Sequence, residues 1–365
     1  MRPSRRKRAT VALVSLLAVS GCRGATRAAS PKTLPFEQIL NDSRTVPLSM
    51  PSENPLLEPI AATARGDQLV IVDQGQADLK VVERASGRLL RIVGQAGDGA
   101  GDFRRPVDIA LLDSGQFAVL DNGRQLISFR DSLGEVRSEV RTPSLSWAML
   151  ALLPERRLVV PGPNVSPRDY FRKTPALHVL DFQGHVERSL GKAIRPRSYW
   201  EESYSTVLLT HLGDQLLVGS MNSNRVRIVD PHSAYERWLA VAEGWYKEPS
   251  WPQDGPRGEG PQSTIQRMRV WARQQCMTNG LFSLGTSRFL TRFLAFDSTG
   301  ARTYFYAVTD TAGRTLAITK ATTAFVLTTV GDTAIWIAKT QDGKLSLGSG
   351  IVSESFLGVG RRRPI

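Results

Sequence analysis

Side chains that could perform catalysis are few in this sequence, and they do not fall into a known spacing. The four histidines are scattered over strand and turn segments: His178, His185, His211 and His232. The series Gly97-x-Gly99-x-Gly101 lacks the helix that must follow a phosphate-binding loop. Asp108 is the one carboxylate at the start of an expected innermost strand, and a single ligand does not hold a divalent ion. We therefore expect no metal, no cofactor and no catalytic residue, and a structural hydrogen-bonding role for Asp108.

The two cysteines are expected to have separate roles. Cys22 ends the series Val19-Ser20-Gly21-Cys22, which matches a lipobox, so its sulfur is predicted to carry the lipid anchor. Cys276 is then left alone, and we expect no intramolecular disulfide. Because it lies beside Met277 in an apolar neighbourhood, a buried thiol is favoured over a nucleophile.

The elements that must position these residues are visible between Gly94 and Val136. Apolar runs of about five residues, the usual strand length, alternate there with turns rich in Gly, Asp and Asn. Asp and Asn side chains close local hydrogen bonds in such turns, as in Asp121-Asn122-Gly123. Four antiparallel strands of this kind are only marginally stable alone, so the unit should recur.

Similar units do recur along the chain. Six copies follow one another at a spacing of about 40–60 residues, the range of propeller blades, and the last is expected to span Thr315 to Val352. The sequence predicts an all-β fold, a six-bladed β-propeller of four-stranded antiparallel blades over residues 46–356. Val46 to Met50 could complete the last blade and join the two ends of the chain. The alternative is an unpaired extended arm.

One unit resembles a known repeat. Residues Gly94 to Gly134 carry the glycines, the Phe-x-x-Pro-x-Asp series and the Asp-Ser-Gly turn of an NHL-type blade. The whole chain resembles the six-bladed propeller lipoproteins of bacteria. This resemblance implies the architecture and leaves the function open, because NHL-type propellers include enzymes, protein-binding platforms and nucleic-acid binders.

The N-terminus has the organisation of an export signal. A basic region, Arg2 to Arg8, precedes a short apolar region, Thr10 to Ser20, which is too short to span a membrane. We predict a lipoprotein signal peptide at 1–21 and a lipid-anchored tether at 22–45; an ordinary secretory signal with a chance cysteine is the alternative. By the rule of the lipoprotein family, Arg23 favours the periplasmic face of the outer membrane if the host is diderm.

Charge adds little to the choice of partner. Loss of the five basic residues of the signal reduces the formal net charge from +13 to +8. A basic surface favours weak attraction to anionic lipid or polymer, and export argues against nucleic acid as a partner. The tail at 357–365 contains Arg361-Arg362-Arg363 and is expected to be solvated.

Three segments are longer than blade turns require: Pro161 to Pro175, Gly191 to Ser205 and Glu243 to Thr264. By strand direction they share one face, here called the top face, with the Gly-rich loop before Pro106. Long loops on one face of a rigid scaffold commonly carry binding. Their aromatic and Arg residues are of types enriched at recognition sites. The candidate ligand-binding residues are Phe103, Arg104, Arg105, Asp108, Tyr170, Arg195, Arg197, Tyr199, Trp200, Trp245, Tyr246 and Trp251.

Two interpretations of this face remain open. The aromatic residues could bind a ligand, or they could fold back and cover the tops of the blades. We expect a membrane-anchored, non-catalytic recognition or scaffold protein that binds a protein, peptide or glycan. The runner-up is a hydrolase or lyase using the same face, as in propeller lactonases and amidating lyases, whose several metal ligands this sequence does not provide. A structural spacer with no ligand is a third alternative.

Overall fold

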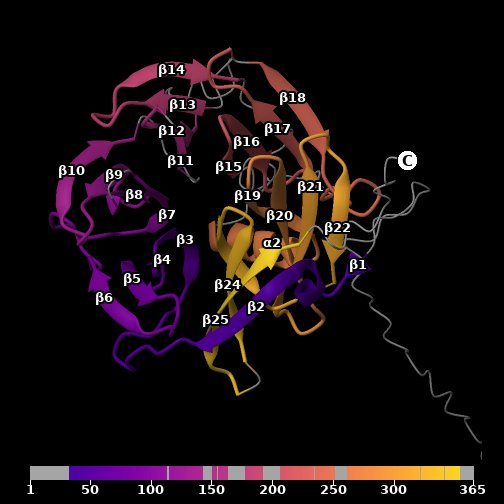
Figure 1. Ribbon diagram of the computed structural model, residues 1–365, viewed down its shortest axis with the longest axis horizontal. Helices are drawn as coiled ribbons and strands as arrows, with labels where there is room; N and C mark the ends of the chain where they lie inside the picture. The colour runs from indigo at the N-terminus through magenta and orange to yellow at the C-terminus, as the bar shows by residue number, and fades with distance from the viewer. Residues whose placement is uncertain are drawn as a thin grey trace, which may run out of the picture.

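The strands form six antiparallel sheets arranged around a common axis, as the blades of a propeller (Figure 1). The computed structural model describes residues 33–112, 115–142, 150–153, 155–162, 177–191, 206–233, 235–250, 261–320, 322–340 and 342–353. The predicted all-β, six-bladed architecture is confirmed. Within the described residues, no helix is long and apolar enough to cross a membrane.

Blade two shows why these sequences form strands. Its two middle strands are buried along their whole length because neighbouring blades cover both of their faces, whereas the outermost strand is mostly exposed. The short turns between them are rich in Gly, Asp and Asn, as the sequence predicts. From the axis outward, the strands are β7 (Pro106–Leu111), β8 (Phe117–Asp121), β9 (Leu126–Arg130) and β10 (Val136–Arg141).

Blades one, three and four follow the same order. Blade one consists of β3 (Pro59–Arg65), β4 (Gln68–Asp73), β5 (Asp78–Glu83) and β6 (Leu89–Val93). Blade three consists of β11 (Ala151–Leu153), β12 (Arg157–Pro161), β13 (Leu177–Leu180) and β14 (Val186–Leu190). Blade four consists of β15 (Val207–Leu212), β16 (Gln215–Ser220), β17 (Arg225–Val229) and β18 (Glu236–Ala240).

The last two blades correct one predicted boundary. Thr315–Thr319 is the fourth strand of blade five, not the start of blade six, because it pairs with the strand that precedes it in the chain. Blade five consists of β19 (Met277–Leu284), β20 (Arg288–Phe296), β21 (Arg302–Asp310) and β22 (Thr315–Thr319). Blade six takes β23 (Phe325–Val330), β24 (Thr333–Lys339) and β25 (Leu345–Val352) from the end of the chain.

The N-terminal segment closes the ring, as the sequence suggested, but the closing strand lies earlier in the chain and shares only Val46 and Pro47 with the predicted Val46 to Met50. Strand β2 (Leu40–Pro47) pairs antiparallel with β25 and is the fourth strand of blade six. Before it, β1 (Thr33–Leu34) pairs parallel with β22, and the short 3₁₀ helix η1 (Phe36–Ile39) links the two. The tether predicted for 22–45 is therefore wrong over 33–45, which belongs to the propeller. Residues 1–32 and 354–365 lie outside the described part.

The hydrophobic core is divided into six clusters, and each lies between two neighbouring blades. One cluster, for example, joins Val70 and Val81 of blade one to Ile109 and Val119 of blade two. The other five fill the remaining interfaces around the ring in the same way. Burial of apolar surface between sheets is therefore what holds the blades together, because each sheet alone leaves its faces uncovered.

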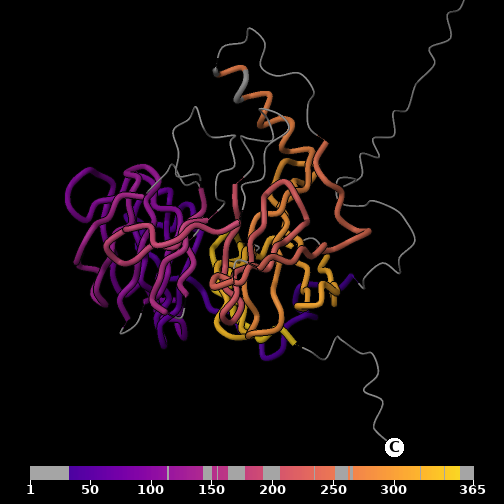
Figure 2. The backbone as a smooth tube through the Cα atoms, turned by 90° about the horizontal axis from the view of Figure 1, so that it is seen from above, coloured from indigo at the N-terminus to yellow at the C-terminus, as the bar shows by residue number. Residues whose placement is uncertain are grey.

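Connections at the two ends of the blades differ in length. Turns on the bottom face are short, as at 66–67, 131–135 and 213–214. The connections attached at the top face include 94–105, 162–176, 191–206 and 241–276. The last of these contains helix α2 (Pro261–Ala272), which the sequence analysis did not predict and which projects from this face (Figure 2).

Candidate functional site

Half of the candidate ligand-binding residues can be placed. Phe103, Arg104, Arg105, Asp108, Trp245 and Tyr246 belong to the described part of the chain. The remaining candidates, together with the predicted lipid anchor at Cys22, lie outside the described residues: Tyr170, Arg195, Arg197, Tyr199, Trp200 and Trp251.

Phe103 is a packing residue and is not exposed to a ligand. Its ring is 0% exposed and belongs to the cluster between blades one and two. The Arg130 guanidinium lies 4.4 Å from the ring centroid. Gly94 leaves room for the ring, since a Cβ there would come within 2.5 Å of Phe103 Cε2. The Gly-rich loop therefore anchors itself through Phe103.

Trp245 and Tyr246 also fold back onto the core. The Trp245 ring lies 5.2 Å from that of Phe305, and the Tyr246 ring lies 5.2 Å from that of Phe293. Tyr246 is 8% exposed, and burial raises the pKa of its hydroxyl. For these two residues, the structure agrees with the interpretation in which aromatic side chains cover the blade tops.

Asp108 is buried at the wall of a cavity along the propeller axis. Its Oδ2 accepts a hydrogen bond of 2.6 Å from the backbone N–H of Leu150, which ties blade two to the start of blade three. Burial raises the pKa of the Asp108 carboxyl to about 7, and hydrogen bonds from the backbone of Leu150 and Ile109 oppose this shift. This is the structural hydrogen-bonding role that the sequence favours.

The axial cavity has a volume of about 370 Å³ and is lined by the innermost strands of all six blades. Its walls combine apolar residues such as Leu152 and Leu327 with polar and charged ones such as Thr210 and Arg292. His211 also lines it, toward the end of β15 that faces the bottom, and its side chain is exposed there. Among the described residues, no group of three or more His, Cys, Asp or Glu side chains converges as metal ligands would.

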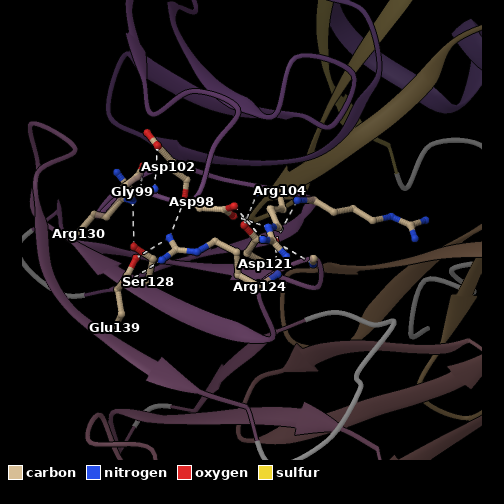
Figure 3. A network of polar contacts seen from close by, with 12 residues as sticks. Asp98, Gly99, Asp102, Arg104, Asp121, Arg124, Ser128, Arg130 and Glu139 are labelled. Carbon is tan, nitrogen blue, oxygen red and sulfur yellow. Dashed lines mark hydrogen bonds and ion pairs between the residues drawn. The ribbon is translucent and has the colours of Figure 1, made fainter.

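A second, polar hollow lies at the top of blade two, and we call it the blade-two groove (Figure 3). It has a volume of about 640 Å³. Charged side chains from the Gly-rich loop, from the start of β9 and from the end of β10 meet there. The lining residues are Asp98, Arg104, Gly123, Arg124, Gln125, Leu126, Glu139, Val140 and Arg141.

A buried carboxylate holds the backbone of this groove in place. Asp121, at the end of β8, is 0% exposed and accepts hydrogen bonds from four backbone N–H groups. Two come from Arg104 and Arg105, at 2.8 and 3.0 Å, and two from Gly123 and Arg124, at 2.8 and 3.1 Å. Because these contacts fix both edges of the groove, the side chains of Arg104 and Arg124 start from defined positions.

Two arginines of the groove each bind a carboxylate through two nitrogens of the guanidinium. Arg104 contacts Asp98 through Nε and through Nη2, the latter at 2.8 Å. Arg124 contacts Glu139 at 3.0 and 3.3 Å and also donates to the backbone oxygen of Asp102. Hydrogen bonding from Arg104 lowers the pKa of the Asp98 carboxyl. The groove thus already recognises carboxylates in the planar geometry that arginine favours.

Of the charged residues that line the groove, only Arg104 was predicted from the sequence as a binding residue; Asp98, Arg124, Glu139 and Arg141 were not. Asp121 was visible only as a turn residue, in Asp121-Asn122-Gly123. Glu139 lies on β10, one strand away from Arg124, and only the register of β9 against β10 brings the two together. Spacing along the chain therefore gave no sign of this pair.

Cys276 corrects another expectation. It is 1% exposed, as predicted for a buried residue, but its sulfur is disulfide-bonded. The sequence contains one other cysteine, Cys22, which lies outside the described residues. The expectation of a free thiol at Cys276 is therefore wrong.

The fold and the two hollows define a class: a six-bladed β-propeller with an axial cavity and long connections on one face. No family model matches the sequence, and no curated protein matches it. Among solved structures, a candidate exported protein from Bacteroides fragilis is similar, with 10% identity and a TM-score of 0.60, over 87% of this chain and 97% of that one.

A member of the DUF4221 family from Bacteroides vulgatus is also similar, with 9% identity and a TM-score of 0.58, over 86% of this chain and 96% of that one. Virginiamycin B lyase from Staphylococcus aureus has 9% identity and a TM-score of 0.47, over 85% of this chain and 99% of that one. That score carries no argument about activity. At these identities, the likenesses show the fold alone.

Proposed function

We propose that this propeller is an exported, lipid-anchored recognition or scaffold protein that binds a protein, peptide or glycan on its top face without catalysis. The observation that carries the proposal is the difference between its two faces. Bottom turns such as 66–67 and 213–214 are tight, whereas connections such as 94–105 and 241–276 at the top are long. Extended connections on a rigid scaffold are where proteins commonly place binding residues.

The described part of the top face supports binding more than chemistry. Arg104 lines the blade-two groove, and its side chain, paired with Asp98, is 57% exposed there. The packing of Phe103, Trp245 and Tyr246 stiffens the base of the same face, which lowers the ordering cost of binding.

The test of the top face compares two kinds of surface variant in the mature full chain. A partner is first isolated from the envelope of the expressing bacterium and its affinity for the wild type is measured. Trp200→Ala and Trp251→Ala should each weaken binding at least about tenfold, since truncated hot-spot aromatics cost that much. Leu133→Ala, in an exposed bottom turn, should leave the affinity unchanged. Equal effects of the top and bottom variants would reject the proposal.

The lipid anchor is tested by mass spectrometry of the membrane-extracted protein. We expect an N-terminal peptide that begins at Cys22 and carries acyl chains, and a Cys22→Ser variant that leaves the membrane fraction. A thioether-linked Cys22 could not be the disulfide partner of Cys276. Recovery of an unacylated Cys22 cross-linked to Cys276 would therefore exclude the anchor.

A second candidate function is a hydrolase or lyase working in the axial cavity, and Asp108 is the observation in its favour. A carboxyl with a pKa of about 7 at a cavity wall has the proton affinity of a general acid or base. Turnover of a lactone or ester substrate that is lost in Asp108→Asn, with substrate binding retained, would establish this function in place of recognition.

A further inference from the structure

We propose that the blade-two groove binds a carboxylate side chain of an acidic peptide segment, and that Asp98 occupies the place of this carboxylate until the ligand arrives. The inference rests on the proposed recognition function and names the ligand chemistry for one part of the top face.

The two pairs differ strongly in exposure. In the Arg104–Asp98 pair, the side chains are 57% and 67% exposed. In the Arg124–Glu139 pair they are 15% and 24% exposed, and Arg124 is also held by the backbone oxygen of Asp102. An exposed ion pair contributes little net stability because water and salt screen it. Arg104 can therefore exchange Asp98 for another carboxylate, whereas Arg124 keeps Glu139.

The loop that carries Asp98 is built to hold its ends while leaving Asp98 at the surface. Asp102 Oδ2 accepts a 3.0 Å hydrogen bond from Gly99 N–H, and Gly97 N–H donates to the backbone oxygen of Phe103. Arg130 donates to the backbone oxygen of Gly101 at 2.7 Å. Displacement of the Asp98 side chain breaks none of these contacts, so exchange leaves the loop intact.

The composition of the groove favours an acidic peptide over a sugar. Among the described residues that line it, none has an aromatic ring on which a sugar could stack. Three arginines face two carboxylates, so positive charge is in excess there. Arg141 lies at the end of β10 beside Val140, which offers an apolar contact for the peptide. Within the described residues, Arg141 forms no ion pair, so it can meet a second carboxylate.

The experiment measures fluorescence anisotropy of a labelled hexaglutamate peptide with the purified mature chain. Asp98→Asn should bind about fivefold more tightly than wild type, because the internal competitor is removed. Arg104→Ala should lose about tenfold in affinity, because the bidentate partner is gone. Affinity for the wild type should fall as salt rises.

Matched controls lie on the same face, at the turn between β24 and β25. Asp342 and Lys344 form an exposed ion pair there, with side chains 57% and 81% exposed. Asp342→Asn and Lys344→Ala change the net charge as Asp98→Asn and Arg104→Ala do, and they should leave hexaglutamate affinity within about twofold of wild type.

Three outcomes would overturn the inference. In the first, Asp98→Asn gains no more hexaglutamate affinity than Asp342→Asn, which would mean that Asp98 does not compete with the peptide for Arg104. The second is an equal loss in Arg104→Ala and Lys344→Ala, which would mean attraction to net charge. The third is equal displacement of the peptide by inorganic phosphate and by acetate at the same ionic strength, which would mean a general anion site. None of these outcomes bears on the Trp200 and Trp251 variants, so the proposed function is tested separately.

Discussion

Buried carboxylates mark the points where the chain passes between blades. Asp73, at the end of β4, accepts hydrogen bonds from the backbone N–H groups of Leu57, Glu58 and Gly75 at 2.8–3.1 Å. Asp121 has the same position and role in blade two. Each carboxylate satisfies several N–H groups that would otherwise be buried without partners, which is costly. An aspartate at the end of a middle strand is therefore structural in this fold.

Asp108 should make stability depend on pH. Its pKa is raised from 3.8 to about 7 in the folded chain, so the folded state binds more protons than the unfolded state between these values. Stability therefore falls as pH rises from about 4 to 7, by at most a few kcal/mol, since a shift of one unit corresponds to about 1.4 kcal/mol. In thermal melts from pH 4 to 8, the melting temperature of Asp108→Asn should rise relative to that of the wild type as pH increases. A constant difference would contradict this.

Lys80 and Asp78 form a buried ion pair on β5, where Lys80 is 0% exposed. Burial raises the pKa of Asp78 and the Lys80 contact opposes this. Lys80→Met leaves Asp78 without its partner and should cost about 3–5 kcal/mol of unfolding free energy. Adding Asp78→Asn should recover part of that loss, because the unpaired charge is then removed. Urea unfolding of the single and double variants measures both, and additive losses would argue against the pair.

Among single residues, the sequence predicted roles only where the contact is local. The turn aspartates were interpreted correctly because an aspartate in a turn bonds nearby N–H groups, as Asp131 does with Leu133 and Glu135. A hydrogen bond was expected for Asp108 as well, but its partner Leu150 lies 42 residues further along the chain and could not be read from the sequence. Phe103 was placed among the ligand-binding residues because it belongs, with Arg104 and Arg105, to the Gly-rich loop of the top face, yet its ring is buried by residues far away in sequence. The burial of Trp245 and Tyr246 was likewise not predictable, because they pack on β20 and β21, which follow much later in the chain.

At the scale of elements, the N-terminal segment joins blades five and six. Strand β1 pairs with blade five, β2 pairs with blade six, and η1 crosses between them. Phe36 of η1 is 3% exposed, and its ring lies 5.1 Å from Tyr306 of blade five and 5.2 Å from Trp336 of blade six. The segment is therefore bound both by hydrogen bonds and by a shared hydrophobic cluster.

Phe36→Ala should destabilise the propeller by about 3–5 kcal/mol, the usual cost of deleting a buried phenyl ring. The loss should appear in urea unfolding and in increased hydrogen exchange of β2 and β22. Leu57→Ala is the control, because Leu57 is 58% exposed and should change stability by less than about 0.5 kcal/mol. An equal effect of the two substitutions would mean that η1 does not bind the blades.

The sequence predicted the blade strands well and the added elements poorly, for a physical reason. Blade strands are buried on both faces and bounded by glycine and aspartate turns, so both signals are local. In β2, only the first residue is buried, so no alternation marks it. Helix α2 begins at Pro261, a residue that suits the first helical turn, but it follows a long Pro- and Gly-rich stretch that was interpreted as a loop.

At the scale of the whole molecule, stability depends on closing the ring. Removing residues 1–50 takes away β1, η1 and β2, and it leaves blade six with three strands. We expect this chain to lose cooperative unfolding and to bind a hydrophobic dye, because the edge of β25 and the cluster around Trp336 become exposed.

The control for this truncation is a chain that starts at Thr33. Both chains carry Cys276→Ala, so that the disulfide plays no part in the comparison. The longer chain should melt as cooperatively as the full-length Cys276→Ala protein. If the chain without 1–50 also does so, β2 is dispensable for ring closure.

Because β2 closes the ring by pairing with β25, blade six can be completed only after β25 has been synthesised. The ribosome makes β2 before the other strands of the six blades and makes its partner β25 after them, so β2 stays unpaired on the order of tens of seconds at usual synthesis rates. An unpaired strand can cause aggregation, because its free edges can form hydrogen bonds with strands of other chains. The series Asn41 to Thr45 is polar and exposed, Asp42 has a φ of 48° beside a break in register, and Pro47 ends the strand. These features disfavour pairing of β2 with strands of other chains, so β2 remains available to pair with β25.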